Sequence, residues 1–183
     1  MSYSVVLDTC VLYPAYLRDT LLRLAEATLF RPLWSEDILE ELGRNLTEAG
    51  IPAEVVRRLL TEMQAAFEGA DVVGYQSFLP DMTCDPKDRH VLAAAVSSRA
   101  DALVTFNVKD FPAASRAPYD IELLSPDGFL LGLLDAEPRL VMHTLAEQAA
   151  CYKREPRSIW GLLTALERAG VPGFAEEIRR QFG

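Results

Sequence analysis

The chain of 183 residues contains only three cysteines and two histidines, and it has no long uninterrupted apolar segment. Cys10, Cys84 and Cys151 are widely spaced, so we expect reduced thiols in the core rather than disulfides or metal ligands. With only His90 and His143 available, a zinc site of the usual His/Cys type is not expected. No apolar run approaches the ~18 residues of a membrane span, which predicts a soluble, cytoplasmic protein.

Positive charge is also scarce, because 18 Lys and Arg residues face 27 Asp and Glu residues, for a formal net charge of −9. This balance argues against a general nucleic-acid binder, since contacts to phosphates need Lys and Arg. Neither a G-x-G-x-x-G motif nor a P-loop follows the first apolar segment, which argues against a nucleotide cofactor. A cluster of acidic residues that binds a metal ion would explain part of the negative charge.

Apolar segments alternate with amphipathic ones over the first two thirds of the chain. We expect strands at residues 3–7, 30–34, 71–75, 100–106 and 121–124, and helices at residues 14–29, 35–46, 52–67 and 85–99. This alternation predicts an α/β fold with a central parallel sheet between helices. Residues 127–182 have only helical patterns, so we divide the chain into a domain of residues 1–125 and a helical extension of residues 126–183 docked on it.

Two predicted strands end on polar residues. The stretch VVLDTCVL places Asp8 at the end of an apolar strand, where removing a carboxylate from water is costly. The stretch LVTFNVKDF places Thr105, Asn107 and Asp110 after a later strand. Turn or capping roles are the alternatives for Asp8, Asn107 and Asp110. Parallel sheets bind ligands at the carboxyl ends of their strands, so these side chains are also candidates for one site.

Two further carboxylates lie in predicted helices. In SEDILEELGRNL, which Ser35 is expected to cap, Glu41 lies about 110° from the centre of the apolar arc and Glu40 about 150°, so only Glu41 flanks the buried face. In CDPKDRHVL, Asp85 has the pattern of a helix N-cap. The same capping pattern explains Asp88 less well, because Glu or Gln is favoured three residues after the cap.

The physical cost of grouping carboxylates indicates what would hold them together. Two carboxylates about 4 Å apart repel by roughly 4 kcal/mol at an effective dielectric constant of ~20. A cluster therefore needs a cation, and ligands that are all oxygen favour Mg²⁺ or Mn²⁺. Such an ion would stabilise the charge that develops on a phosphoryl group.

The segments VVLDTCVL, ILEEL, DPKDRHVLAAA and LVTFNVKDF, in this order and spacing, resemble those of the PIN-domain nucleases and, within them, the VapC-type toxins of toxin–antitoxin pairs. The resemblance covers residues 1–125 and implies a doubly wound α/β/α sandwich that cleaves RNA with Mg²⁺. It implies a catalytic and metal-binding quartet of Asp8, Glu41, Asp88 and Asp110, supported by Thr105 and Asn107. It also implies a cognate antitoxin that inserts a segment into the site, and homodimers are common among similar proteins.

The extension contains the basic, aromatic stretch CYKREPRSIW. Its residues Lys153, Arg154, Arg157 and Trp160 are candidates for contacts with RNA phosphates and bases. The alternative interpretation is an exposed loop beside a tryptophan buried in the core.

Functions other than RNA cleavage either fit the sequence less well or stay open as alternatives. A phosphatase of the haloacid-dehalogenase type needs a second Asp two positions after Asp8, where this chain has Cys10. A non-catalytic PIN-like interaction module and a housekeeping PIN nuclease that is not a toxin stay open as alternatives. The four carboxylates argue against the interaction module, because an idle site has no reason to keep groups that repel one another.

Overall fold

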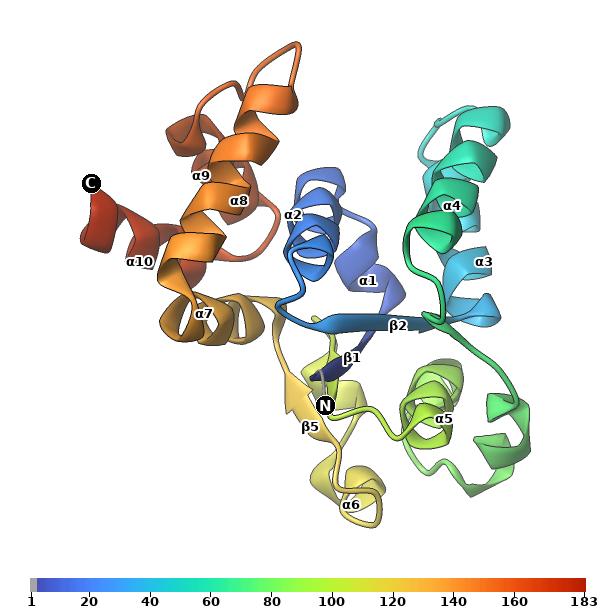
Figure 1. The fold of residues 1–183 in the computed structure, drawn as a ribbon. Coiled ribbons are helices and arrows are strands. Elements are labelled where there is room, and N and C mark those ends of the chain that lie inside the picture. The colour runs from blue at the N-terminus through green and yellow to red at the C-terminus, as the bar shows by residue number, and fades with distance from the viewer. Residues whose placement is uncertain (1–2) are drawn as a thin grey trace.

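The computed structural model describes residues 3–183, and its centre is a five-stranded, all-parallel sheet (Figure 1). The strands are β1 (Ser4–Leu7), β2 (Arg31–Ser35), β3 (Asp71–Val72), β4 (Ala102–Val104) and β5 (Glu122–Leu124), in the spatial order β3-β2-β1-β4-β5. The predicted α/β sandwich with a central parallel sheet is confirmed. Residues 1 and 2, which the expected first domain includes, lie outside the described residues.

The strand order creates a switch point between β1 and β4. The chain runs outward from β1 to β2 and β3, and then returns to the other side of β1 to form β4 and β5. The β1–β4 register pairs Val6 with Leu103, and the amide of Asp8 continues the ladder by donating to the carbonyl of Val104 at 3.1 Å. Connections that leave neighbouring strands in opposite directions open a crevice at their carboxyl ends, where α/β proteins bind ligands.

Helices cover both faces of the sheet (Figure 1). On one side lie α1 (Thr9–Leu12), α2 (Ala15–Glu26), α3 (Glu36–Glu48) and α4 (Ala53–Ala66), and on the other lie α5 (Arg89–Ser98) and α6 (Ala113–Arg116). The predicted cap of α3 is confirmed, because the Ser35 hydroxyl accepts from the amide of Ile38 at 3.3 Å. Because both faces are covered, the residues of β1 from Val5 to Leu7 are fully buried, which accounts for its unbroken apolar run.

Several short elements were not expected from the sequence. They are the helices α1 and α6 and the 3-10 turns η1 (Tyr75–Asp81), η2 (Pro86–Asp88) and η3 (Val108–Asp110). Each of α1, α6, η2 and η3 is at most four residues long, too short to show helical periodicity in the sequence. The segment predicted as one helix over 85–99 is therefore a 3-10 turn followed by α5.

The residues after Ser125 are helical, as predicted. They form α7 (Pro126–Ala136), α8 (Pro138–Cys151), α9 (Ile159–Arg168) and α10 (Pro172–Phe182), and α8 and α9 pack against α2. The rings of Phe30 and Phe129 meet edge to face with centroids 4.9 Å apart, which joins α7 to the end of the α2–β2 connection. None of the helices in the described part of the chain is long and apolar enough to cross a bilayer.

A buried polar network fastens α8 to α2. The Thr20 hydroxyl donates to Gln148 Oε1 at 2.8 Å, and Gln148 Nε2 donates to the Tyr152 hydroxyl at 2.9 Å. That hydroxyl donates in turn to Asp19 Oδ2 at 2.5 Å. Thr20 and Gln148 are fully buried, so their polar atoms need partners inside the protein, and the carbonyl of Tyr16 is a further acceptor for both. The extension is therefore docked by specific contacts as well as by apolar burial.

Replacing Gln148 should loosen this docking. We expect Gln148→Leu to lower the free energy of unfolding by about 1–3 kcal/mol, because the buried Thr20 and Tyr152 hydroxyls lose a partner. Chemical denaturation measures the change. Gln181→Leu, at an exposed position on α10, is the matched control and should change stability by less than about 0.5 kcal/mol. Equal effects of the two substitutions would contradict a role for the Gln148 network in docking.

Candidate active site

Asp8 follows β1 directly, and its buried carboxylate is held by two donors. The Thr105 hydroxyl, from the end of β4, donates to Asp8 Oδ2 at 2.6 Å. The thiol of Cys10 donates to the same oxygen at 3.2 Å. The amide of Asn107 donates to Thr105 Oγ1 at 2.9 Å and fixes that hydroxyl. Asp8 caps no helix with its side chain, so the capping alternative is wrong.

Cys10 is the only one of the three cysteines in contact with the predicted quartet. Burial, and then the neighbouring Asp8 carboxylate, raise the pKa of the Cys10 thiol to about 12, so it stays protonated as a donor. All three cysteines are free thiols, as predicted. The expectation that all lie in the core is wrong, because Cys10 is half-buried and Cys151 is exposed on α8.

Glu41 points from α3 toward the end of β1. The Thr9 hydroxyl lies 3.2 Å from Glu41 Oε2 and the same distance from the carbonyl of Ile38. His90 Nε2 lies 3.5 Å from Glu41 Oε2. Glu40 is exposed, so the predicted difference between the two neighbouring glutamates is confirmed.

The two aspartates before α5 have different environments. Asp85 Oδ1 accepts from the amide of Lys87 at 3.1 Å, so its predicted capping role is confirmed, although it caps η2 rather than an α-helix. Asp88 makes no side-chain capping bond, and its buried Oδ2 has no hydrogen-bond partner within residues 3–183. Burial, and then the negative charge of Asp8, raise the pKa of Asp88 from 3.8 to about 7. Capping therefore does not account for Asp88.

A lysine connects Asp88 with Asp110. Lys87 Nζ lies 3.2 Å from Asp110 Oδ2 and 3.9 Å from Asp88 Oδ2, and contact with Asp110 raises the pKa of Lys87. Asp110 is the last residue of η3, while α6 begins only at Ala113, so the helix-cap alternative for Asp110 is wrong. The ammonium group thus occupies the position of a counter-ion between two of the predicted acids.

Within residues 3–183, the remaining sequence candidates donate no side-chain hydrogen bond to these carboxylates. Asn107 contributes its backbone amide, whereas its exposed side chain makes no capping bond. Lys153, Arg154 and Arg157 are exposed on the loop between α8 and α9, and none of them pairs with a carboxylate within residues 3–183.

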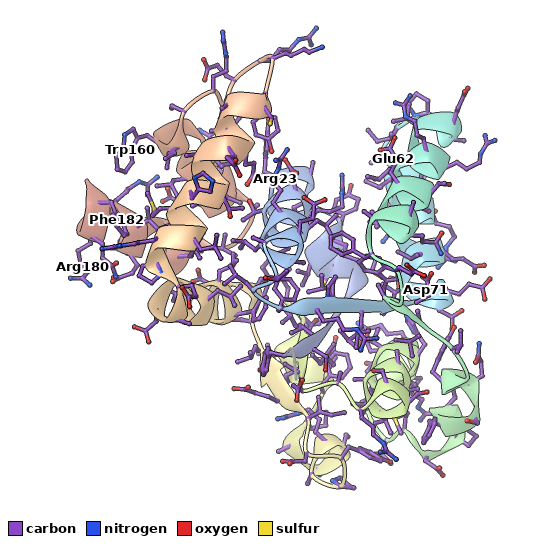
Figure 2. All side chains as sticks on the ribbon, viewed as in Figure 1. Arg23, Glu62, Asp71, Trp160, Arg180 and Phe182 are labelled. Atoms are coloured by element: carbon purple, nitrogen blue, oxygen red, sulfur yellow. The ribbon has the colours of Figure 1, made fainter. Side chains whose placement is uncertain are left out.

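Trp160 does not lie in the core. Its side chain is 47% exposed, and Figure 2 places it on the outer side of the extension, away from α4. The alternative of a core tryptophan is therefore wrong. The expectation that this ring contacts RNA bases stays a prediction.

The donor set fits a hard divalent cation, although the side chains do not form a ready-made cage. Within residues 3–183 no three acidic, histidine or cysteine side chains lie close enough together to hold a metal ion. The buried Asp88 Oδ2 without a partner and the Lys87 ammonium between two carboxylates both indicate a place for positive charge. Carboxylate oxygens are the ligands preferred by Mg²⁺ and Mn²⁺.

Four residues beside the predicted quartet were not identified from the sequence as parts of a site. They are Thr9, Cys10, Lys87 and His90. Each lies one or two positions from a predicted acid along the chain, and that proximity is the only signal the sequence offers. Which of them turn toward the acids depends on α1 and η2, the short elements that the sequence pattern does not reveal.

Comparison with known proteins places this arrangement in a family. The family model described as PIN domain matches residues 4–109, more than half of the 183 residues, and ends one residue before Asp110. The model described as VapC50 C-terminal domain matches residues 126–180. The chain belongs to the PIN domain family, and the resemblance found in the sequence is confirmed.

The chain is also similar in sequence to a named protein. The chain is 41% identical over 109 residues to the protein named "Putative ribonuclease VapC50" of Mycobacterium tuberculosis (strain ATCC 25618 / H37Rv). The alignment covers 60% of this chain and 64% of that protein, which is less than two thirds of the relative's length. No solved structure matches the chain.

The raised pKa of Asp88 predicts how stability depends on pH. Between about pH 4 and pH 7 the folded protein keeps a proton on Asp88 that the unfolded chain has lost, so this group makes stability fall as the pH rises through that range. Asp88→Asn removes the effect. In EDTA, we expect the melting temperature of the variant minus that of wild type to increase from pH 4.5 to pH 7.5. Each kcal/mol of difference in the free energy of unfolding should appear as about 2–4 °C.

Thermal melts across this pH range, with Glu40→Gln as the control at an exposed site, test the prediction. The control difference should change much less over this range, because Glu40→Gln leaves the buried Asp88 carboxylate in place. A flat difference for Asp88→Asn as well would show that ionisation of the buried Asp88 carboxylate does not destabilise the folded protein.

Proposed function

We propose that the protein is an endoribonuclease that depends on Mg²⁺ or Mn²⁺ and acts in the cytoplasm as the toxin of a toxin–antitoxin pair. The observation that carries the proposal is the group of acids around the switch point, where the buried Asp88 Oδ2 has no hydrogen-bond partner within residues 3–183. Membership of the PIN domain family and the ribonuclease name of the mycobacterial relative support it. The division into a nuclease domain (1–125) and an extension (126–183) is part of the proposal.

In this proposal Asp8, Glu41, Asp88 and Asp110 hold the cation. Asp8 is oriented by Thr105 and Cys10, and Glu41 is flanked by Thr9 and His90. When bound, a divalent cation stabilises the negative charge that develops on a phosphoryl group and makes water a better nucleophile.

Lys87 is placed for a second role. It lies at the exposed rim of the site and neutralises Asp110. If Asp110 held a cation, the Lys87 ammonium group would be free to approach the substrate phosphate.

The acids make a direct prediction for RNA cleavage. Asp8→Asn and Asp88→Asn should each lower the rate of cleavage in Mg²⁺ or Mn²⁺ by at least about 100-fold, because each removes a negatively charged ligand of the cation that stabilises charge on the reacting phosphate. Glu41→Gln should also lower the rate, whereas Glu40→Gln, at the exposed neighbouring position, should not. Rates are measured on single-stranded RNA, with EDTA as the blank.

The outcome separates the proposal from its alternatives. Wild-type protein that binds a candidate antitoxin but cuts no RNA with either metal would support the non-catalytic interaction module. Cleavage without growth arrest when the protein is produced alone would favour a housekeeping nuclease. Cleavage by Asp88→Asn at the wild-type rate would remove Asp88 from the site.

The basic loop is the second part of the proposal. Lys153, Arg154 and Arg157 are free of ion pairs within the described residues and are available to bind RNA phosphates. Replacing all three with Gln should weaken RNA binding and flatten the dependence of log K on log salt by up to about three units. Binding is measured by fluorescence anisotropy in Ca²⁺.

A control triple variant tests whether position matters. Arg139, Arg168 and Arg180 are exposed elsewhere on the extension, and Figure 2 shows Arg180 at its far end. Replacing these three with Gln changes the net charge equally but should leave the salt slope within about one unit of wild type. Equal slopes for the two triple variants would contradict a specific role for the loop.

A further inference from the structure

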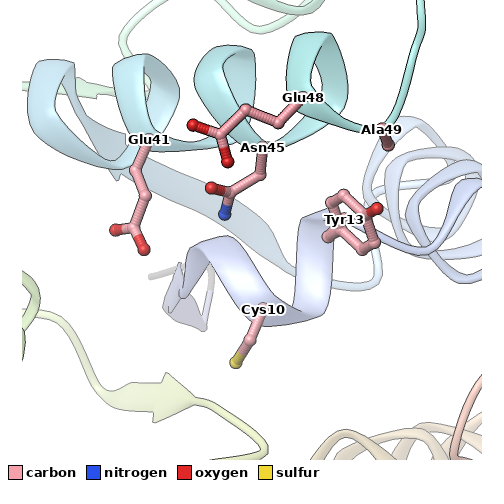
Figure 3. A pocket seen from close by; sticks show the side chains of 6 residues that line it. All are labelled: Cys10, Tyr13, Glu41, Asn45, Glu48 and Ala49. Atoms are coloured by element: carbon pink, nitrogen blue, oxygen red, sulfur yellow. The ribbon is translucent and has the colours of Figure 1, made fainter.

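An open pocket of about 460 Å³ lies between α1 and α3, next to the predicted metal ligands (Figure 3). We call it the α1–α3 pocket. Its lining residues are Cys10, Tyr13, Glu41, Asn45, Glu48 and Ala49. The roles assigned above to the four acids leave Tyr13, Asn45 and Glu48 without a function.

The pocket is continuous with the predicted reaction centre. Cys10 lines it and also donates to Asp8 Oδ2 at 3.2 Å, and Glu41 belongs to both the pocket and the quartet. A group bound in the pocket is therefore next to a phosphate held at the acids. In a nucleic-acid strand, the group adjacent to a phosphate is a nucleoside.

The walls of the pocket carry a flat ring and unused polar groups. The ring of Tyr13 is 40% exposed, and Figure 3 shows it beside Asn45 across the gap between α1 and α3. On α3 the side chains of Glu41 and Thr47 have hydrogen-bond partners, whereas within residues 3–183 the Asn45 amide and the Glu48 carboxylate have none. The polar groups of Asn45 and Glu48 are thus available to a ligand.

The charge of the lining selects the part of a nucleotide that fits. Glu41 and Glu48 are acidic, and no Lys or Arg lines the pocket, so a phosphate is excluded by repulsion. A nucleobase carries no charge, stacks on an aromatic ring, and presents N–H donors at its edge. A carboxylate accepts from the amino group of cytosine, and an asparagine amide pairs with the edge of adenine.

The backbone at Tyr13 is held in place before any ligand binds. The guanidinium group of Arg18 donates to the carbonyl of Leu12 at 2.7 Å and to that of Tyr13 at 3.2 Å. These bonds fix the junction between α1 and α2 that carries the ring. A stacking surface that is already ordered loses little entropy on binding.

We propose that the α1–α3 pocket binds the nucleobase next to the scissile phosphate, stacked on Tyr13 and recognised by Asn45 and Glu48. The acceptors on Glu48 favour bases that carry an amino group, namely adenine, cytosine and guanine, over uracil. This inference rests on the proposed ribonuclease function and adds a base preference to it.

The first experiment measures kcat/KM on short RNAs that differ only in the nucleotides on either side of the cut. Wild type should prefer an amino-bearing base over uracil by about tenfold at one of these positions. Glu48→Gln should reduce that preference to less than about twofold, because the amide also donates to the uracil carbonyl. Tyr13→Leu should raise KM about tenfold for every RNA, and Tyr13→Phe, which keeps the ring, should raise it less.

The matched control is Glu40→Gln, which removes the same charge from the exposed side of α3 and should keep the wild-type base preference. If Glu48→Gln and Tyr13→Leu cleave with unchanged preference and KM, the pocket does not hold a base, whereas the ribonuclease proposal stands. If wild type cuts no RNA in Mg²⁺ or Mn²⁺, the ribonuclease proposal fails instead.

The second experiment needs no catalysis. Adenosine, cytidine, guanosine and uridine, each without phosphate, are titrated in EDTA while the NMR signals of the Asn45 side-chain amide are followed. The three amino-bearing nucleosides should shift these signals more than uridine does, and Glu48→Gln should reduce the difference. N-acetylarginine amide is titrated in parallel. Shifts with this guanidinium probe but not with any nucleoside would overturn the inference and assign the pocket to an arginine of a protein partner.

Discussion

The structure depends on keeping ionisable carboxylates at the buried carboxyl edge of a parallel sheet. Asp8 must end β1 in an almost dry position, and it is tolerated because Thr105 and Cys10 both donate to one of its oxygens. Asp88 has no such donors and responds with a pKa raised to about 7. These carboxylates therefore destabilise the fold, and a bound cation would offset that cost. Many active sites lose stability in this way for the sake of function.

The sheet and most of the long helices could be predicted because their residues follow periodic patterns. The sheet is covered on both faces, which explains the buried run from Val5 to Leu7. Helix α3 is covered on one face, which explains its apolar arc. The same arc separated Glu41 from Glu40, and the weak capping pattern at Asp88 correctly left it free for another role.

What could not be predicted depends on elements too short to have a period. The four residues of α1 turn Cys10 back toward Asp8 and carry Tyr13 to the face of α3. The three residues of η2 place Lys87 against Asp110, a contact between segments more than twenty positions apart. Trp160 was misjudged for a different reason: a large apolar side chain is usually buried, but its position on the outer side of α9 is decided by how the extension docks.

The extension contributes to the site through the backbone near β4. A side chain on Gly170, in the turn between α9 and α10, would meet the ring of Phe106 at 2.8 Å, so the two segments are in close contact. The amide of Phe106 lies 3.4 Å from Cys10 Sγ, and the next residue donates to Thr105. The loop that orients Asp8 thus contacts Cys10 of α1 on one side and Gly170 of the extension on the other. A helical segment outside the sheet therefore contributes to the order of the site without supplying an acid.

Charge finally constrains how the proposed ribonuclease would bind RNA. With a net charge of −9 and carboxylates at the site, long-range attraction for phosphates is weak until cations are present. Binding without cations then has to come from groups that do not depend on overall charge, such as a stacked base between α1 and α3, or from local positive charge such as the loop between α8 and α9. A base in the pocket and phosphates on the loop would hold the strand on both sides of the acids. The strand would then already be positioned before a cation binds. The reaction would therefore depend on the cation more strongly than RNA binding does.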